Sequence, residues 1–128
     1  MDARFDPLRA LGLRAGDAHI IRNAGGRASD DAIRSLVASC LLLGTTQVLV
    51  IHHTDCGMMA ATNEDLRNEV RRRLGVDASG IDFMTFTDLE QSVRDDIESI
   101  RSSPFLPAEL AVSGSIYDVR NGRLREVE

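Results

Sequence analysis

The stretch Gln47-Val48-Leu49-Val50-Ile51-His52-His53 decides the fold of this 128-residue chain. Its centre is a continuous run of β-branched and aliphatic residues, which is typical of a strand buried on both faces in a parallel sheet. Parallel strands need long connections, usually helices, and these helices cover the faces of the sheet. The stretch therefore predicts an α/β fold with a mainly parallel β-sheet flanked by helices.

The helix before this strand is predicted from apolar residues spaced three and four positions apart. It spans Asp30–Leu43, begins after the capping residue Ser29 and ends at Gly44. The residues on its predicted apolar face are Ile33, Leu36, Val37, Cys40 and Leu41. This position predicts that Cys40 is a small core residue rather than a metal ligand.

Further elements are predicted on both sides of this pair. A helix over Asn63–Leu74 ends at Gly75, and a helix over Asp88–Ser102 begins with the capping box Thr87-Asp88-Leu89-Glu90. Their apolar sides comprise Leu66, Val70 and Leu74 in the first and Leu89, Val93, Ile97 and Ile100 in the second. Strands are predicted at Ala18–Arg22 and Leu110–Val119, and an Asn121-Gly122 turn leads into a short return strand that ends at Val127.

The composition fits one domain over residues 1–128, with 43% hydrophobic and 27% charged residues. No apolar run approaches the roughly 20 residues that cross a bilayer, and no secretory signal opens the chain. We therefore expect a cytoplasmic protein without membrane contact. The net charge of −5 and the 4% aromatic content argue against nucleic-acid binding. The run Arg71-Arg72-Arg73 is interpreted as the solvated side of a helix.

Two short motifs supply metal-binding or acid–base groups. His53 and Cys56 lie on the loop that leaves the predicted strand, where an imidazole nitrogen and a thiolate can face a common metal ion. A polar strand end with an incidental thiol is the alternative, because two ligands alone are a weak metal signal. Asp2 and Arg4 can form a bidentate ion pair. A frayed terminus with two solvated charges is the alternative there.

The turn Arg22-Asn23-Ala24-Gly25-Gly26 is a third candidate, because it also follows a predicted strand. Paired glycines let the backbone approach a small ligand closely, and they equally make an ordinary turn. Ligands in α/β folds gather outside the carboxyl ends of parallel strands. We therefore expect this turn and the loop after His53 to lie at the same edge of the sheet.

Taken together, these segments resemble the β-class carbonic anhydrases, and most closely the smaller bacterial enzymes of that class. The similarity runs from Asp2 to about Val127. It is carried, in order, by Asp2-Ala3-Arg4-Phe5-Asp6-Pro7, Gly16-Asp17-Ala18-His19-Ile20-Ile21-Arg22-Asn23-Ala24-Gly25-Gly26, Asp31-x-Ile33-Arg34-Ser35-Leu36, His52-His53-Thr54-Asp55-Cys56-Gly57-Met58 and Gly114-Ser115-Ile116-Tyr117-Asp118-Val119. The resemblance implies a zinc-dependent lyase that reversibly hydrates carbon dioxide to bicarbonate, by attack of zinc hydroxide on CO2. It also implies a homodimer or larger homo-oligomer, and we expect the Asp30–Leu43 helix near its interface.

The resemblance also implies roles for individual residues. His53 and Cys56 match two zinc ligands, and Asp2 is a plausible third. Asp2 and Arg4 match a catalytic dyad, in which the arginine holds the aspartate ready to accept a hydrogen bond from the zinc-bound hydroxide. The glycines at positions 25 and 26, Gly25 and Gly26, match a loop that lines the CO2 pocket. His52 is either a proton carrier or a hydrogen-bonded histidine at the end of the strand.

The chain departs from the family at its beginning. The family motif is Cys-x-Asp-x-Arg, whose cysteine would stand one position before Met1, and the family has an N-terminal helical arm and a strand that leads into this cysteine. We expect either that Met1 is an internal methionine of a longer protein or that the chain is a shortened relative. We expect residues 1–128 by themselves to bind zinc weakly or not at all and to hydrate carbon dioxide poorly. A restored cysteine with its strand should recover both properties.

Two other functions stay open at this point. Hydrolysis of carbonyl sulfide or carbon disulfide would use a similar fold and zinc site, and the lining of the pocket would distinguish it from hydration. A metal-depleted, non-catalytic dimeric relative is the other possibility, which the missing cysteine favours. Measuring the zinc content of the purified protein would distinguish such a relative from the two enzymes.

Overall fold

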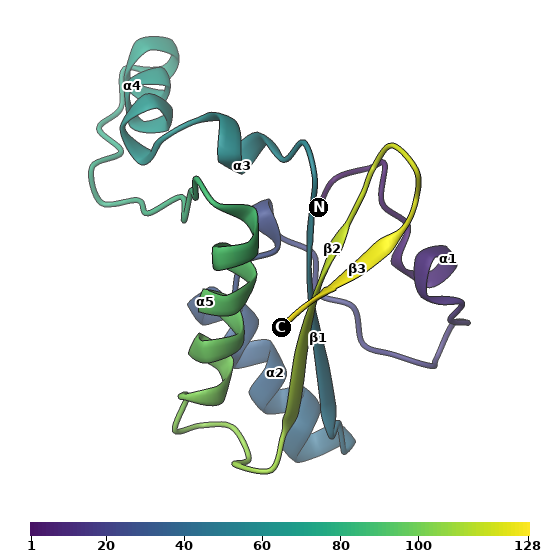
Figure 1. Cartoon of the computed structure of the whole chain (residues 1–128). Coiled ribbons are helices and arrows are strands. Elements are labelled where there is room, and N and C mark those ends of the chain that lie inside the picture. Colours follow the sequence, from purple (N-terminus) through teal and green to yellow (C-terminus); the bar gives the residue numbers. More distant parts are fainter.

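A computed structural model of the protein describes all residues, 1–128, and contains one three-stranded sheet (Figure 1). Strand β1 (Gln47–His53) runs parallel to β2 (Ala111–Tyr117), and β2 pairs antiparallel with β3 (Leu124–Val127). The register places His53 opposite Tyr117, at the carboxyl ends of β1 and β2. The predicted α/β fold is confirmed and β1 has the predicted bounds, but the sheet is not mainly parallel, because one of its two strand pairs is parallel and the other antiparallel.

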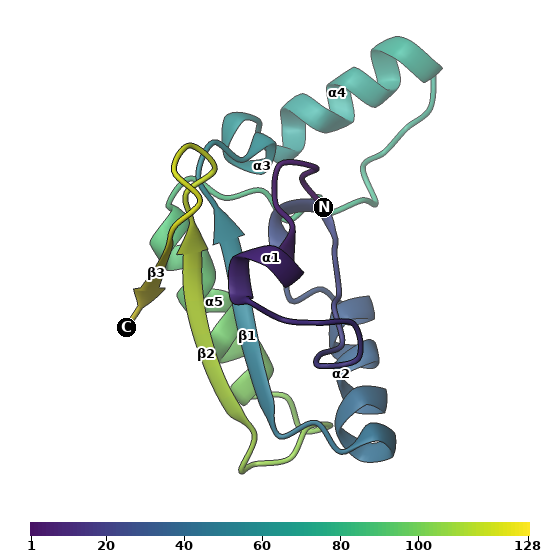
Figure 2. The same ribbon diagram turned by 90° about the vertical axis from the view of Figure 1, so that its right-hand side faces the viewer.

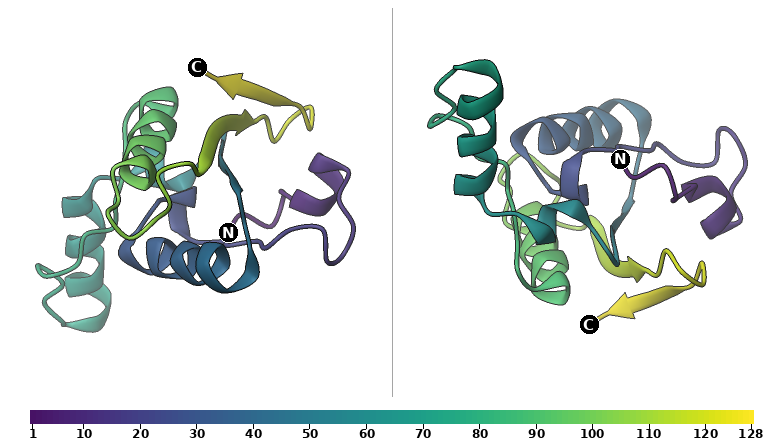
Figure 3. Two further views of the ribbon diagram at one scale, coloured as in Figure 1. Left: turned by 90° about the horizontal axis from the view of Figure 1, so that it is seen from below. Right: turned by 90° about the horizontal axis from the view of Figure 1, so that it is seen from above.

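Helices lie on both sides of this sheet. They are α1 (Pro7–Leu11), α2 (Asp30–Leu43), α3 (Gly57–Ala60), α4 (Asn63–Leu74) and α5 (Leu89–Arg101), with a 3₁₀ turn η1 (Ala24–Gly26) before α2. α2 and α5 lie on one side of the β1–β2 pair and α1 on the other (Figure 3). α4 extends away from the sheet (Figure 2) and buries no residue. No helix is both long and apolar enough to span a membrane.

The hydrophobic core lies between α5 and the β1–β2 pair. The buried residues of this core are Leu36, Val50, Val93, Ile97, Ile100, Val112, Ile116 and Val127. Gly114 in β2 lets α5 approach the sheet, because a Cβ at this position would clash with the side chains of Val93 and Ile97. The apolar stripe predicted for α5 is therefore confirmed as the face that covers the strands.

The helix ends follow the local sequence closely. α2 and α4 have the predicted bounds, and Gly44 and Gly75 end them in the left-handed conformation. The start of α5 differs from the prediction, because the Asp88 side chain accepts a hydrogen bond from the Gln91 backbone N–H and Thr87 takes no part. Strand β2 is shorter than predicted and ends at Tyr117, while the Asn121-Gly122 turn and the return strand are confirmed.

The strand predicted at Ala18–Arg22 is wrong. The segment is not a strand, and none of its backbone groups takes part in a backbone–backbone hydrogen bond. It borders an open groove of about 840 Å³ whose other side is β1, so no strand lies close enough to pair with it. β1 is consequently an edge strand. Leu49 on β1 is 40% exposed, so the prediction that both faces of this strand are buried is wrong for the Leu49 face.

Two predicted apolar faces are also partly wrong. Leu41 at the end of α2 and Leu74 at the end of α4 are exposed rather than packed. Cys40 is buried in α2 as predicted, and burial raises the pKa of its thiol. Leu41 lies in the last turn of α2, beyond its buried residues, and α4 buries none of its residues, so helical spacing alone does not show which part of an apolar stripe is covered.

Candidate functional site

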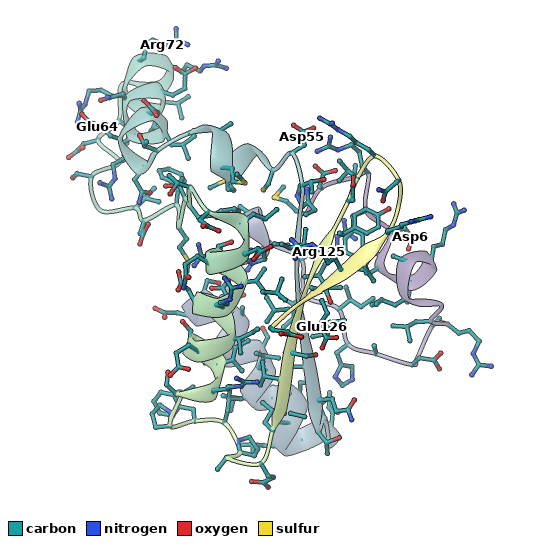
Figure 4. All side chains as sticks on the ribbon, in the orientation of Figure 1. Asp6, Asp55, Glu64, Arg72, Arg125 and Glu126 are labelled. Carbon is teal, nitrogen blue, oxygen red and sulfur yellow. The ribbon has the colours of Figure 1, made fainter.

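The predicted site residues gather where β1 ends. His53 is the last residue of β1, and Cys56 directly precedes α3. Asp55, between them, lies on the loop beyond the end of β1 (Figure 4). The N-terminal segment reaches the same place, because the Arg4 side chain bonds to Asp55. The structure therefore places His53, Cys56 and Arg4 together beyond the carboxyl end of β1.

Asp2 and Arg4 form the bidentate ion pair that their spacing predicts. Arg4 Nε donates to Asp2 Oδ1 at 2.9 Å, Arg4 Nη2 donates to Oδ2 at 2.7 Å, and the Arg4 backbone N–H donates to Oδ1 at 2.8 Å. Hydrogen bonds from Arg4 hold the pKa of the Asp2 carboxyl well below its usual range, and the same pair raises the pKa of Arg4. Asp2 therefore carries a fixed negative charge at neutral pH.

Arg4 also connects the N-terminal segment to the loop that carries Cys56. Its Nη1 donates to Asp55 Oδ2 at 2.7 Å and its Nη2 donates to the Asp55 carbonyl at 3.1 Å. Asp55 adopts a left-handed backbone conformation with φ 56°, and the hydrogen bond from Arg4 lowers the pKa of its carboxyl. Sequence reasoning missed Asp55, because its partner lies 51 residues away along the chain.

Arg22 anchors the same N-terminal segment from the other side. Its Nη1 donates to the Phe5 carbonyl at 2.9 Å and its Nη2 donates to the Asp2 carbonyl at 2.6 Å. The Met1 amino group donates to the Asn23 carbonyl at 2.8 Å. These three hydrogen bonds fix the segment in place rather than leaving it frayed, and so fix the direction of the Asp2 carboxylate.

His53 presents one ring nitrogen to the site. Its Nδ1 lies 2.9 Å from the Thr54 carbonyl, which can only accept, so Nδ1 carries the hydrogen. Nε2 is then free to bind a cation, and it lies 3.9 Å from Asp2 Oδ2. A backbone partner that fixes the tautomer in this way is typical of histidines that bind metals.

The donor set fits zinc in kind, since imidazole nitrogen and thiolate sulfur are its preferred protein ligands. His53 is largely covered and Cys56 is buried. No three histidine, cysteine or acidic side chains converge closely enough to hold an ion in this arrangement. Asp2, the plausible third ligand, is turned toward Arg4 instead.

Gly25 and Gly26 pack against β1 and the loop that follows it. Both have positive φ, +76° and +71°, and a Cβ on Gly26 would lie 2.8 Å from the Ile51 carbonyl oxygen and 3.0 Å from His52 Cδ2. A Cβ on Gly25 would lie 3.3 Å from Met58 Cγ. Only a residue without a side chain permits this close approach, which brings the turn beside the candidate site.

Gly26→Ala is expected to lower the free energy of unfolding by about 2–4 kcal/mol, because a left-handed residue with a Cβ is strained and this Cβ also meets fixed backbone. Urea unfolding followed by circular dichroism measures the loss. Gly44→Ala is the matched control, because Gly44 has φ +75° but open space around its Cβ, so only the conformational strain applies. Equal losses of unfolding free energy in the two variants would show that the close approach to Ile51 does not contribute to the destabilisation.

His52 is a hydrogen-bonded histidine at the end of the strand rather than a proton carrier. It is 1% exposed, and its ring contacts Ser92 Oγ at 2.8 Å and Asp96 Oδ2 at 2.9 Å. With both nitrogens engaged in the interior, His52 has no contact with solvent through which to carry a proton.

The comparisons with known proteins agree on one family. Residues 1–124 match the family model described as carbonic anhydrase. The chain is 39% identical over 127 residues to beta-carbonic anhydrase 1 of Mycobacterium tuberculosis, covering 99% of this chain and 77% of the relative. It is 32% identical over 145 residues to a carbon disulfide hydrolase of Acidithiobacillus thiooxidans, covering 98% and 72%. Among solved structures, carbonic anhydrase from Streptococcus mutans superposes with a TM-score of 0.98 at 53% identity, covering 100% of this chain and 77% of that chain.

Proposed function

The chain belongs to the β-class carbonic anhydrases, and from this membership we propose that it hydrates carbon dioxide reversibly to bicarbonate, as a lyase with a zinc cofactor. The observation that carries the proposal is the position of Asp2. Its carboxylate is fixed by Arg4 and faces the free nitrogen of His53 at 3.9 Å. A fixed anion beside a metal-binding nitrogen is the arrangement needed to orient a nucleophile.

His53 and Cys56 would hold the zinc ion, and Asp2 is a possible third ligand. A bound zinc ion would lower the pKa of a coordinated water to about 7 and so supply a nucleophile at neutral pH. Asp2 can serve as a ligand only if it leaves Arg4, because both of its oxygens accept from that side chain. Ligation by Asp2 and its dyad with Arg4 therefore compete.

The residues of the chain have separable roles in this proposal. Asp2 stays ionised and accepts a hydrogen bond from the attacking water, which orients the oxygen toward carbon dioxide. Arg4 keeps the carboxylate in that direction, and its bonds to Asp55 hold the loop before Cys56. Gly25 and Gly26 allow the turn to lie against β1, beside the place where carbon dioxide would bind.

Stopped-flow hydration of carbon dioxide with a pH indicator tests the proposal directly. We expect a slow rate above the uncatalysed one that requires added zinc and disappears with a chelator. The zinc content per chain is measured on the same samples. A protein that holds zinc one to one and gives no rate above the blank would contradict the proposed activity.

Hydrolysis of carbon disulfide is the second candidate function. Several relatives at 30–34% identity carry the name carbon disulfide hydrolase. Hydrogen sulfide release from carbon disulfide, measured beside carbon dioxide hydration on one zinc-loaded sample, separates the two. We expect hydration to be the faster reaction.

We also propose that residues 1–128 form one domain of a cytoplasmic homodimer or larger homo-oligomer. Leu41, Leu42 and Leu43 support assembly, because they form an exposed apolar surface at the end of α2. β1 beside them is an edge strand, and small domains with an open edge bury little apolar surface by themselves.

Leu42→Glu is expected to shift the protein toward the monomer in sedimentation velocity at micromolar concentration, because a buried interfacial charge is costly. Leu74→Glu is the control, since Leu74 is a similarly exposed leucine at a helix end, 71% against 79%, but lies on α4. An unchanged assembly in the Leu42 variant would exclude this surface as the interface.

A further inference from the structure

A buried polar cluster lies beneath the candidate site, and the proposed mechanism does not use it. Asp96 on α5 is 1% exposed, and its Oδ2 lies 2.9 Å from both His52 Nε2 and Arg27 Nε. Ser92 Oγ donates to the Leu89 carbonyl at 2.8 Å and lies 2.8 Å from His52 Nδ1. The cluster joins the turn before α2, the end of β1 and α5 between Ser92 and Asp96.

Phe86 links this cluster to the loop that carries Cys56. Its ring stacks on His52 with centroids 5.5 Å apart, and the Arg27 guanidinium lies 5.5 Å from the centre of the same ring. The Phe86 backbone N–H donates to the Met58 carbonyl at 3.2 Å, two residues after Cys56. Phe86 and Met58 therefore form a continuous path of contacts between the cluster and the segment that begins at Cys56.

The glycine turn rests on the same cluster. Gly26 approaches the His52 ring so closely that its Cβ would lie 3.0 Å from Cδ2, and Arg27 follows it directly. Gly25 packs beside Met58. The glycine turn and the Cys56 loop, which form two sides of the candidate site, are thus both connected to one set of buried side chains.

Stability alone does not explain such a cluster. Buried ion pairs often contribute no more to stability than apolar residues of the same volume, because burying their charges costs solvation free energy. A fully hydrogen-bonded network instead admits one arrangement of the segments that it joins. Arg27, His52 and Ser92, the partners within the cluster, come from three different segments, so the cluster specifies how those segments meet.

We infer that Asp96 is a positioning residue for Cys56. Through Arg27, His52 and Phe86, it holds the Cys56 loop and the glycine turn in place against β1. The functional meaning of this inference rests on the proposed role of Cys56 as a zinc ligand. Thiol reactivity tests the positioning itself without any metal, so the two proposals can fail separately.

The experiment measures alkylation of each cysteine by iodoacetamide in the chelator-treated full chain, with mass spectrometry to resolve the two sites. Cys40 is an internal control, because it is buried in α2 and reports global opening. Asp96→Asn keeps the size of the side chain and removes its charge. We expect Cys56 to react about tenfold faster relative to Cys40, as local opening of one segment predicts.

Val93→Ala is the matched control variant, since Val93 is fully buried on the same helix but faces the apolar core. It should destabilise the chain and leave the ratio of Cys56 to Cys40 reactivity unchanged. Arg27→Lys is the second variant, for use if Asp96→Asn does not fold. It keeps the positive charge but loses the planar set of guanidinium donors. It should raise the ratio by less than the tenfold expected for Asp96→Asn. Two results would overturn the inference. One is an unchanged ratio of Cys56 to Cys40 reactivity in the cluster variant that folds and is measured. The other is an equal rise of this ratio in Val93→Ala.

Discussion

Cys56→Ser is expected to weaken zinc binding by more than about 100-fold, because a hydroxyl replaces a thiolate ligand and even outer-shell changes cost 10–100-fold. Hydration of carbon dioxide should fall with zinc occupancy. Competition with a chromophoric chelator measures the affinity, and the unfolding curve of the metal-free protein shows that the fold survives. Cys56 is buried at the start of α3, and serine preserves its size there.

Cys40→Ser is the matched control, because Cys40 is the only other cysteine and is equally buried. It should leave zinc affinity unchanged and reduce stability by about 1 kcal/mol, since a hydroxyl enters an apolar stripe of α2. If the two variants lose zinc affinity equally, Cys56 is not a ligand.

Asp2→Asn is expected to lower the hydration rate at saturating zinc by about 100-fold, the usual loss when a positioned proton acceptor is removed. The amide cannot keep both bidentate bonds from Arg4, so the nucleophile loses its orienting anion. Zinc content should not fall if His53 and Cys56 carry the binding. A loss of zinc instead would identify Asp2 as a ligand.

Asp55→Asn is the control for Asp2→Asn, because it also removes a carboxylate from Arg4 but leaves the Asp2 pair in place. Its effect on the rate should be less than about tenfold. Equal losses in both variants would mean that the total charge around Arg4, rather than the direction of Asp2, decides the rate.

The pH dependence follows from the lowered pKa of Asp2. A carboxyl whose pKa is lower in the folded than in the unfolded chain stabilises the fold above its unfolded pKa, and that contribution is lost as pH falls through the folded value. Arg4 keeps the pKa of Asp2 well below its usual range. The ion pair should therefore persist throughout the neutral range, and titration of Asp2 should not appear in a rate profile between about pH 5 and 9.

Local sequence was enough for the elements whose signals lie within one segment. α2 was predictable because Ser29, the apolar spacing and Gly44 lie in consecutive positions, and the Ser29 side chain does accept from Ala32. The Asp2–Arg4 pair was predictable for the same reason, since two residues at that spacing reach each other without help from the fold. The resemblance of several such segments, in order, indicated the family.

Tertiary structure decided the rest, because a contact between distant segments has no local signal. The isoleucines of Ala18–Arg22 favour a strand, but a strand needs a neighbouring edge and this segment has none. Arg4 meets Asp55 and His52 meets Asp96 across 51 and 44 residues, so neither pair could be read from spacing. The sequence by itself identified the candidate site residues. The tertiary structure decided which distant groups hold them, since only the packing of separate segments brings Arg4 to Asp55 and His52 to Asp96.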